Sequence, residues 1–284
     1  MKKIRFPLAL LVLAVVALSL PLMASADHSW GNYHWDISTN ESIDSPLQIG
    51  DQLNGVWDSS LIATSADWND LGNDPVRTVL FNGIAAGSNT DCSPIIGRVE
   101  ACNSEYGENG WLGLAQIWVY RGKDGHIAQA LVKVNDTYFN TPTYNTPAWR
   151  DFVMCQEVGH TFGLGHQDET FDTANLGTCM DYTNDPDGTE NGQASNLHPN
   201  QHDFDVLYQK YGHLNGVSDG KGGGGTNKPG GGNGGGKGKP AQVPGDDISQ
   251  WGKAISTDGN GRPNEFELTL RNGDKMITHV LWAN

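Results

Sequence analysis

The chain has 284 residues, of which 33 are aspartate or glutamate and 18 are lysine or arginine, giving a formal net charge of −15. So strong an excess of negative charge repels the phosphates of nucleic acids and anionic membrane surfaces. We therefore expect no nucleic-acid partner and no membrane insertion.

The first 26 residues have the pattern of a secretory signal peptide. Basic residues at positions 2, 3 and 5 precede an apolar run over residues 6–20, and the small residues 24–26 form an Ala-x-Ala cleavage site. The apolar run is too short to anchor the chain in a membrane. We expect a secreted, extracellular protein of bacterial type that begins near Asp27, with its net charge changed from −15 to −18.

The composition divides the rest of the chain. Residues 215–245 are rich in glycine with scattered lysine and proline, which predicts a flexible linker. Residues 27–214 before it are long enough for one domain with its own core. The aromatic start of this domain, "HSWGNYHW", predicts an anchor that packs over the body.

The body begins with an expected helix, "LNGVWDSSLIATSADWNDL", followed by a strand within "PVRTVLFNGIAAG". The helix periodicity places five apolar residues on one face: Val56, Leu61, Ile62, Ala66 and Trp68. Two further strands are joined by the polar turn "RGKDGH", in which Asp-Gly is the hairpin signal. The first of these strands, "LGLAQIWVY", is a candidate edge on which an extended substrate could pair.

A longer helix is expected after Thr146, which serves as its cap, with Pro147 in its first position. The last helix of the body is "PNQHDFDVLYQKYG", closed by Gly212. Residues 246–284 contain two runs typical of strands around "RNGDK". We expect this C-terminal β segment, whose role the sequence does not indicate, to dock on the body or to form a small β module.

The stretch "CQEVGHTFGLGH" carries the chemistry. On a helix, Gln156 and His160 lie four residues apart on one face, and Glu157 lies one position round. Gly163 permits the chain to turn sharply, so that His166 returns toward the same place. Two ligand side chains with an adjacent carboxylate are the arrangement that a zinc hydrolase needs.

This motif resembles the signature of the metzincin metallopeptidases, H-E-x-x-H-x-x-G-x-x-H followed by a methionine-containing turn. Here it reads Q-E-V-G-H-T-F-G-L-G-H, and "GTCMDY" supplies Met180 as the Met-turn residue and Tyr182 beside the zinc. The closing helix is similar to that of matrixins and serralysins. The resemblance spans residues 146–212 and implies an α/β (α+β) zincin domain, with a small mixed sheet, an active-site helix and one catalytic Zn²⁺.

The family has a histidine where this chain has Gln156. The amide oxygen of glutamine reaches about as far as that histidine's outer nitrogen, although it is a weaker donor to zinc. We therefore expect zinc on Gln156, His160 and His166, with Glu157 as general base in a zinc endopeptidase acting on protein or peptide substrates. Asp168, His198 and His202 are other candidate ligands. The alternative function is an impaired metzincin-fold module that binds or supports other molecules.

The four cysteines, at positions 92, 102, 155 and 179, allow three disulfide pairings. The metal site implied by the resemblance requires the segments of Cys155 and Cys179 to be neighbours, which favours that pair and Cys92 with Cys102. The acidic stretch "NDPDGTEN", residues 184–191, is a weak candidate for Ca²⁺. We expect a monomer.

Overall fold

The computed structural model describes residues 28–36, 46–70, 80–211 and 245–284. Four expected features lie outside the described residues: the signal peptide, the Gly-rich linker up to residue 244, Gly212, and the first residues of the strand expected near 75–87. None of the helices in the described ranges combines the length and apolar character needed to cross a lipid bilayer.

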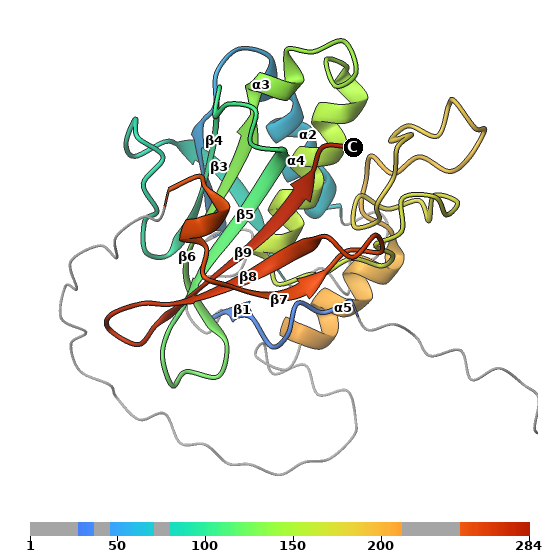
Figure 1. Cartoon of the computed structure of the whole chain (residues 1–284). Coiled ribbons are helices and arrows are strands. Elements are labelled where there is room, and N and C mark those ends of the chain that lie inside the picture. Colours follow the sequence, from blue (N-terminus) through green and yellow to red (C-terminus); the bar gives the residue numbers. More distant parts are fainter. Residues whose placement is uncertain (1–27, 37–45, 71–79, 212–244) are drawn as a thin grey trace, which may run out of the picture.

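The strands of the described residues form one nine-stranded sheet, in the order β3-β2-β4-β6-β5-β9-β8-β7, with β1 paired to β6 (Figure 1). Their bounds are β1 His34–Trp35, β2 Leu47–Gln52, β3 Asn82–Ala86, β4 Arg98–Ser104, β5 Trp111–Val119, β6 His126–Asn135, β7 Lys253–Thr257, β8 Pro263–Thr269 and β9 Lys275–Trp282. Strands β1, β2, β3, β4 and β6 run parallel, while β5, β7, β8 and β9 pair antiparallel. The protein is therefore a mixed α/β fold, as expected.

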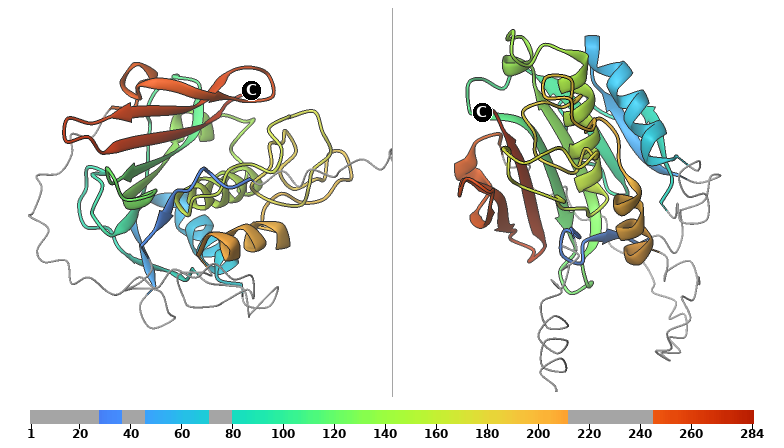
Figure 2. Two further views of the ribbon diagram at one scale, coloured as in Figure 1. Left: turned by 90° about the horizontal axis from the view of Figure 1, so that it is seen from below. Right: turned by 90° about the vertical axis from the view of Figure 1, so that its right-hand side faces the viewer.

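Helices α2 and α4 pack together on one face of this sheet (Figure 2). The helix bounds are η2 Gly55–Trp57, α2 Asp58–Trp68, α3 Asp136–Phe139, α4 Pro147–Thr161, α5 Gln201–Tyr211 and η3 Ile248–Gln250. The expected start of α4 is confirmed, because the Thr146 side chain accepts a hydrogen bond from the Trp149 amide (3.2 Å) and Pro147 follows the cap. The cap fixes where the helix begins and hence which residues face the sheet.

The apolar face expected for the first helix is wrong in part. Val56 lies before α2, in the turn η2, and is 60 % exposed, while Ile62 is 62 % exposed. The buried face instead combines Leu61 and Trp68 with the small polar residue Thr64. Adjacent residues of a helix point about 100° apart, so a face that buries Leu61 turns Ile62 toward solvent.

The C-terminal segment, residues 246–284, docks on the body by extending its sheet. Strand β9 pairs along β5 from Trp111↔Trp282 to Val119↔Lys275. On the face away from α4, Trp251 and Phe266 of this segment join a buried apolar cluster with Trp111. Burial of several aromatic side chains stabilises the docking, since each removes a large apolar area from water.

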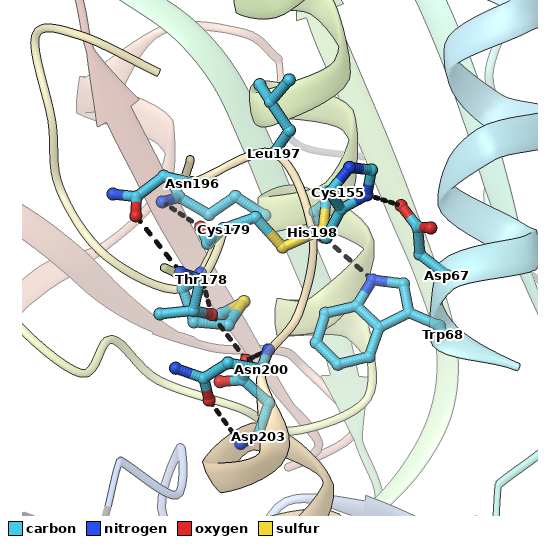
Figure 3. The surroundings of a disulfide bond; sticks show 12 residues. Asp67, Trp68, Cys155, Thr178, Cys179, Asn196, Leu197, His198, Asn200 and Asp203 are labelled. Carbon is cyan, nitrogen blue, oxygen red and sulfur yellow. Dashed lines mark hydrogen bonds and ion pairs between the residues drawn. A yellow bond between two sulfur atoms is a disulfide. The ribbon is translucent and has the colours of Figure 1, made fainter. Parts of the chain in front are cut away.

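Both disulfides favoured by the sequence analysis are present, Cys92–Cys102 and Cys155–Cys179. The second joins α4 to the loop that carries Met180 (Figure 3). Beside it, Trp68 of α2 donates its indole N–H to the carbonyl oxygen of Cys155 (3.1 Å). Helix α4 is thus held at Cys155 both by α2 and by the disulfide.

Candidate metal centre

Helix α4 carries the first part of the site on a fully buried turn. Gln156, Glu157 and His160 have almost no exposed surface. The helix ends at Thr161, and Gly163 then adopts φ +87°, a left-handed conformation that favours glycine. This turn brings His166 back to the helix, where its ring centroid lies 4.6 Å from that of His160.

The two histidines are oriented by hydrogen bonds at their inner nitrogens. Nδ1 of His160 lies 2.8 Å from the carbonyl oxygen of Leu164, so this nitrogen carries the proton and donates. Nδ1 of His166 lies 3.0 Å from Oε1 of Glu169. In both rings the buried Nε2 has no hydrogen-bond partner and presents its lone pair. Such outer partners are typical of metal-binding histidines, because they fix the tautomer and the ring orientation.

A third histidine comes from the C-terminal segment. His279 lies on β9 opposite Ala115 of β5, on the face of the sheet that packs against α4. Its ring centroid lies 3.8 Å from that of His160 and 4.5 Å from that of His166. One nitrogen from each of the three rings lies within 4.8 Å of the others, so the three residues can hold a metal ion.

The chemistry of these atoms fits a metal better than an empty core. Five buried polar atoms at this point lack a hydrogen-bond partner: Nε2 of His160, Nε2 of His166, Nδ1 of His279 and both carboxylate oxygens of Glu157. Leaving such groups unsatisfied costs about 1–3 kcal/mol each. Burial lowers the pKa of His160 and of His279 well below the usual range, with smaller contributions from neighbouring histidines. Both rings are then neutral at pH 7, which is the form that binds metal ions.

Gln156 points its amide group toward the loop after α4. Its Nε2 donates to the carbonyl oxygens of Cys179 (2.9 Å) and Asp181 (3.4 Å). Because both partners are acceptors, the nitrogen and oxygen of the amide are assigned without ambiguity. The amide oxygen, Oε1, is buried and has no partner. Gln156 therefore offers an unoccupied oxygen donor from the same helix turn as His160.

Met180 packs against α4 and lies on the turn that the sequence predicted. A methyl group placed on Gly159 would lie 2.6 Å from Sδ of Met180, so the absence of a side chain at Gly159 allows this close approach. The turn itself is held by Asp181, whose carboxylate accepts hydrogen bonds from the amide of Leu176 (2.9 Å) and from Asn196 (2.8 Å). Met180 thus packs against α4 on a turn that hydrogen bonds to Asp181 hold in place.

Glu157 faces the histidines from α4. Its Oε2 lies 3.7 Å from Nδ1 of His279, and burial raises its pKa well above the usual range. The side chain fits because β5 has a glycine opposite it: a methyl group on Gly113 would lie 2.5 Å from Oε1 of Glu157. A carboxyl group 3.7 Å from a histidine of the cluster is placed to exchange a proton with a group bound there.

Tyr182 is buried, and its hydroxyl group lies between two residues of the C-terminal segment. Its Oη is 3.3 Å from Nε2 of His279 and 3.3 Å from Nδ2 of Asn264. Asn264 also donates to Oε1 of Glu169 (3.2 Å), the same oxygen that contacts His166. Tyr182 therefore contacts His279, and Asn264 contacts the Glu169 carboxylate that orients His166. The two residues also contact each other.

The other candidate ligands lie elsewhere. His198 pairs with Asp67 (2.7 Å) and exposes 61 % of its side chain. The ring of His202 stacks near that of His28, with centroids 4.6 Å apart. The carboxylate oxygens of Asp168 accept hydrogen bonds from Thr170 N (2.9 Å) and Thr173 Oγ1 (2.7 Å).

The acidic stretch considered for Ca²⁺ forms hydrogen bonds within its own loop. The Asp185 carboxylate accepts from the amides of Glu190 (3.3 Å) and Asn191 (2.9 Å). Asp187 likewise accepts from Thr189, through both the amide (3.0 Å) and the hydroxyl (2.6 Å). These bonds join the residues of the loop to one another, and the Ca²⁺ site stays a prediction.

Sequence reasoning missed His279, Asn264 and Gly113. A signal for the first existed: in β9, residues 277, 279 and 281 alternate onto one face, and His279 falls between Ile277 and Leu281. A histidine at a core position of a strand needs a polar partner. Nothing in the sequence showed that this strand would lie beside α4.

Comparison with known proteins adds no assignment. No family model matches the chain, and no curated protein matches it significantly.

Proposed function

We propose that this protein is a secreted zinc-dependent endopeptidase, as the resemblance to metzincins implies. The observation that carries the proposal is the set formed by two oriented histidines, His160 of α4 and His166 of the turn after it, and the unpartnered, buried carboxyl group of Glu157 on α4. The two disulfides are compatible with an oxidising, extracellular location.

The residues divide the work of peptide hydrolysis between them. His160 and His166 hold the metal through Nε2, and the amide oxygen of Gln156 is a further donor from the same helix. Bound zinc would supply a Lewis acid that acidifies water and polarises the scissile carbonyl group. Glu157 takes a proton from the attacking water and returns it to the leaving amine. Tyr182, once freed from His279, is placed to donate a hydrogen bond to the developing oxyanion.

The donor set favours zinc over Ca²⁺ and Mg²⁺. Imidazole nitrogens together with an amide or carboxylate oxygen suit zinc, whereas Ca²⁺ and Mg²⁺ prefer sites made of oxygen atoms alone. All three histidine rings reach the centre with little or no exposed surface. The ion would thus be shielded from bulk water on the protein side.

A second candidate is an extracellular metal-binding module without catalysis. The complete burial of Glu157 and of His279 favours it, because a peptidase needs a site that its substrate can enter. The two functions differ in one measurable property: only the peptidase requires a carboxyl group at position 157.

The test is to measure zinc content and cleavage of an unfolded protein substrate by the mature full chain and by its Glu157→Gln variant. We expect about one zinc per chain in both proteins and a loss of cleavage of about 10²–10⁴-fold in the variant. Zinc in both proteins with no cleavage by either would assign the chain to the metal-binding module. Equal cleavage by the two proteins would overturn the role of Glu157 as general base. A wild-type protein that takes up no zinc contradicts both functions.

A further inference from the structure

We propose that the C-terminal segment holds the metal centre closed: His279 ligates the metal through Nδ1, and β9 fills the strand edge that a peptide substrate would use. This inference rests on the proposed function and adds its regulation. It starts from His279, the histidine of the cluster that lies outside the motif, on β9 and more than a hundred residues beyond α4 in the sequence.

His279 lies next to Glu157, the proposed general base. A general base must lie within hydrogen-bond reach of the water that it activates. In this structure Nδ1 of His279 stands 3.7 Å from Oε2 of Glu157, so the imidazole fills the space in which that water would bind. His279 and an attacking water cannot occupy this space together.

The two ring nitrogens of His279 have different surroundings. Its Nε2 lies 3.3 Å from the Tyr182 hydroxyl oxygen, whereas its buried Nδ1 has no hydrogen-bond partner. A proton on Nε2 that is donated to Tyr182 leaves a lone pair on Nδ1, in a ring whose centroid lies 3.8 Å from that of His160. This is the same arrangement by which Leu164 and Glu169 orient the other two rings.

Three residues with candidate metal-binding atoms remain when His279 is left aside. Gln156, His160 and His166 come from α4 and the turn after it, and each has an unpartnered donor atom. In the proposed site these three donors would hold zinc and leave one coordination position. His279 is therefore an additional ligand, which occupies the position that catalysis needs.

Strand β9 covers the edge of β5. An extended peptide binds most readily along an exposed strand, through backbone hydrogen bonds. From the sequence we expected β5 to offer such an edge, but β9 is paired antiparallel along it from Trp111 to Val119. The segment thus blocks peptide binding and the catalytic position at once, and a substrate must displace β9 from β5.

Further contacts hold the segment against the loop that carries His166. The Gly259 amide donates to the Glu169 carbonyl oxygen (2.9 Å), and Asn264 donates to the Glu169 carboxylate (3.2 Å). Tyr182, from the same loop, contacts both Asn264 and His279. The closed state is therefore fixed by side chains at the site as well as by the pairing of strands.

The experiment compares the mature full chain with its His279→Ala variant, and uses His198→Ala as the matched control because His198 lies on the surface outside the cluster. Zinc affinity is measured by competition with a chromophoric chelator, and cleavage of an unfolded protein is measured at saturating zinc. We expect His279→Ala to weaken zinc binding at least about tenfold, the range that lost metal-site partners produce. We expect its cleavage rate to rise at least tenfold, and His198→Ala to match the wild type in both.

The His279→Gln variant guards against misfolding, because glutamine keeps a polar group near Tyr182; circular dichroism of the metal-free proteins shows whether each variant is folded. Unchanged zinc affinity in folded His279 variants would overturn the ligand assignment. Cleavage that falls at saturating zinc would overturn the closure and make His279 part of the working site. Weakened zinc binding without cleavage by any of the proteins supports the ligand but contradicts the peptidase function, so the two failures are distinguishable.

Discussion

The motif region, residues 146–182, and the C-terminal segment, residues 246–284, reach the same metal centre by different means. In the motif region a capped helix, a glycine turn and the disulfide Cys155–Cys179 place the ligands locally. The C-terminal segment is held by strand pairing and by side chains, and both disulfides of the described residues lie outside it. The first region is therefore built to keep its geometry, and the second can be released without breaking a covalent bond.

The largest expected effect is the gain in stability on zinc binding. The same experiment shows whether both regions bind one ion. At free zinc a thousandfold above the Kd, the folded state gains about 4 kcal/mol relative to the metal-free protein. Hydrogen exchange should slow in both α4 and β9 on adding zinc. The His160→Ala variant, which removes a ligand from the motif region, should lose both effects; protection confined to α4 would contradict a ligand on β9.

Breaking the two disulfides separately should sharpen the comparison within the body. Replacing Cys155 and Cys179 by alanine opens a loop with a sequence separation of 24, and should cost about 3 kcal/mol in urea unfolding. Replacing Cys92 and Cys102, with a separation of 10, should cost somewhat less. Only the first pair should also weaken zinc binding; an equal loss from the second pair would show that the disulfide does not position the centre.

Gly113→Ala tests the packing between β5 and α4. The added methyl group would lie 2.5 Å from Oε1 of Glu157 and 2.8 Å from Cγ1 of Val153, so one element must shift. We expect a loss of stability of about 1–3 kcal/mol and slower cleavage with zinc still bound. A double-mutant cycle with Glu157→Ala should recover part of the stability. Additive losses would mean that Gly113 does not make room for Glu157.

Asn264→Ala should produce the smallest effect. It removes hydrogen bonds to Tyr182 and to Glu169, and should lower stability by about 1 kcal/mol while weakening zinc binding through His166. The control is Asn272→Ala, because Asn272 lies in an exposed turn of the same segment and bonds to Asp274. Equal zinc affinity in the two variants would place Asn264 outside the support of the site.

The local features of the motif region could be predicted because they depend on neighbours in sequence. The Thr146 cap, Pro147 and the Gly163 turn follow from backbone geometry that each residue type favours. The pairing of Cys155 with Cys179 followed from the resemblance. The sequence also indicated two C-terminal strands, which the structure contains as β8 and β9.

The contribution of the C-terminal segment could not be predicted, because it depends on which strand β9 pairs with. Alternation along β9 places His279 with Ile277 and Leu281 but does not identify the surface that they cover. The error at Ile62 has a similar cause, since small polar residues such as Thr64 complete the buried face of α2. Periodicity alone does not show which neighbours a face will meet.

The most direct measurement is anomalous diffraction at the zinc edge from crystals of the zinc-loaded mature chain. The account predicts one strong peak bonded to Nε2 of His160, Nε2 of His166 and Nδ1 of His279. A peak held by His160 and His166 with His279 turned away, or no peak at this position, would contradict it.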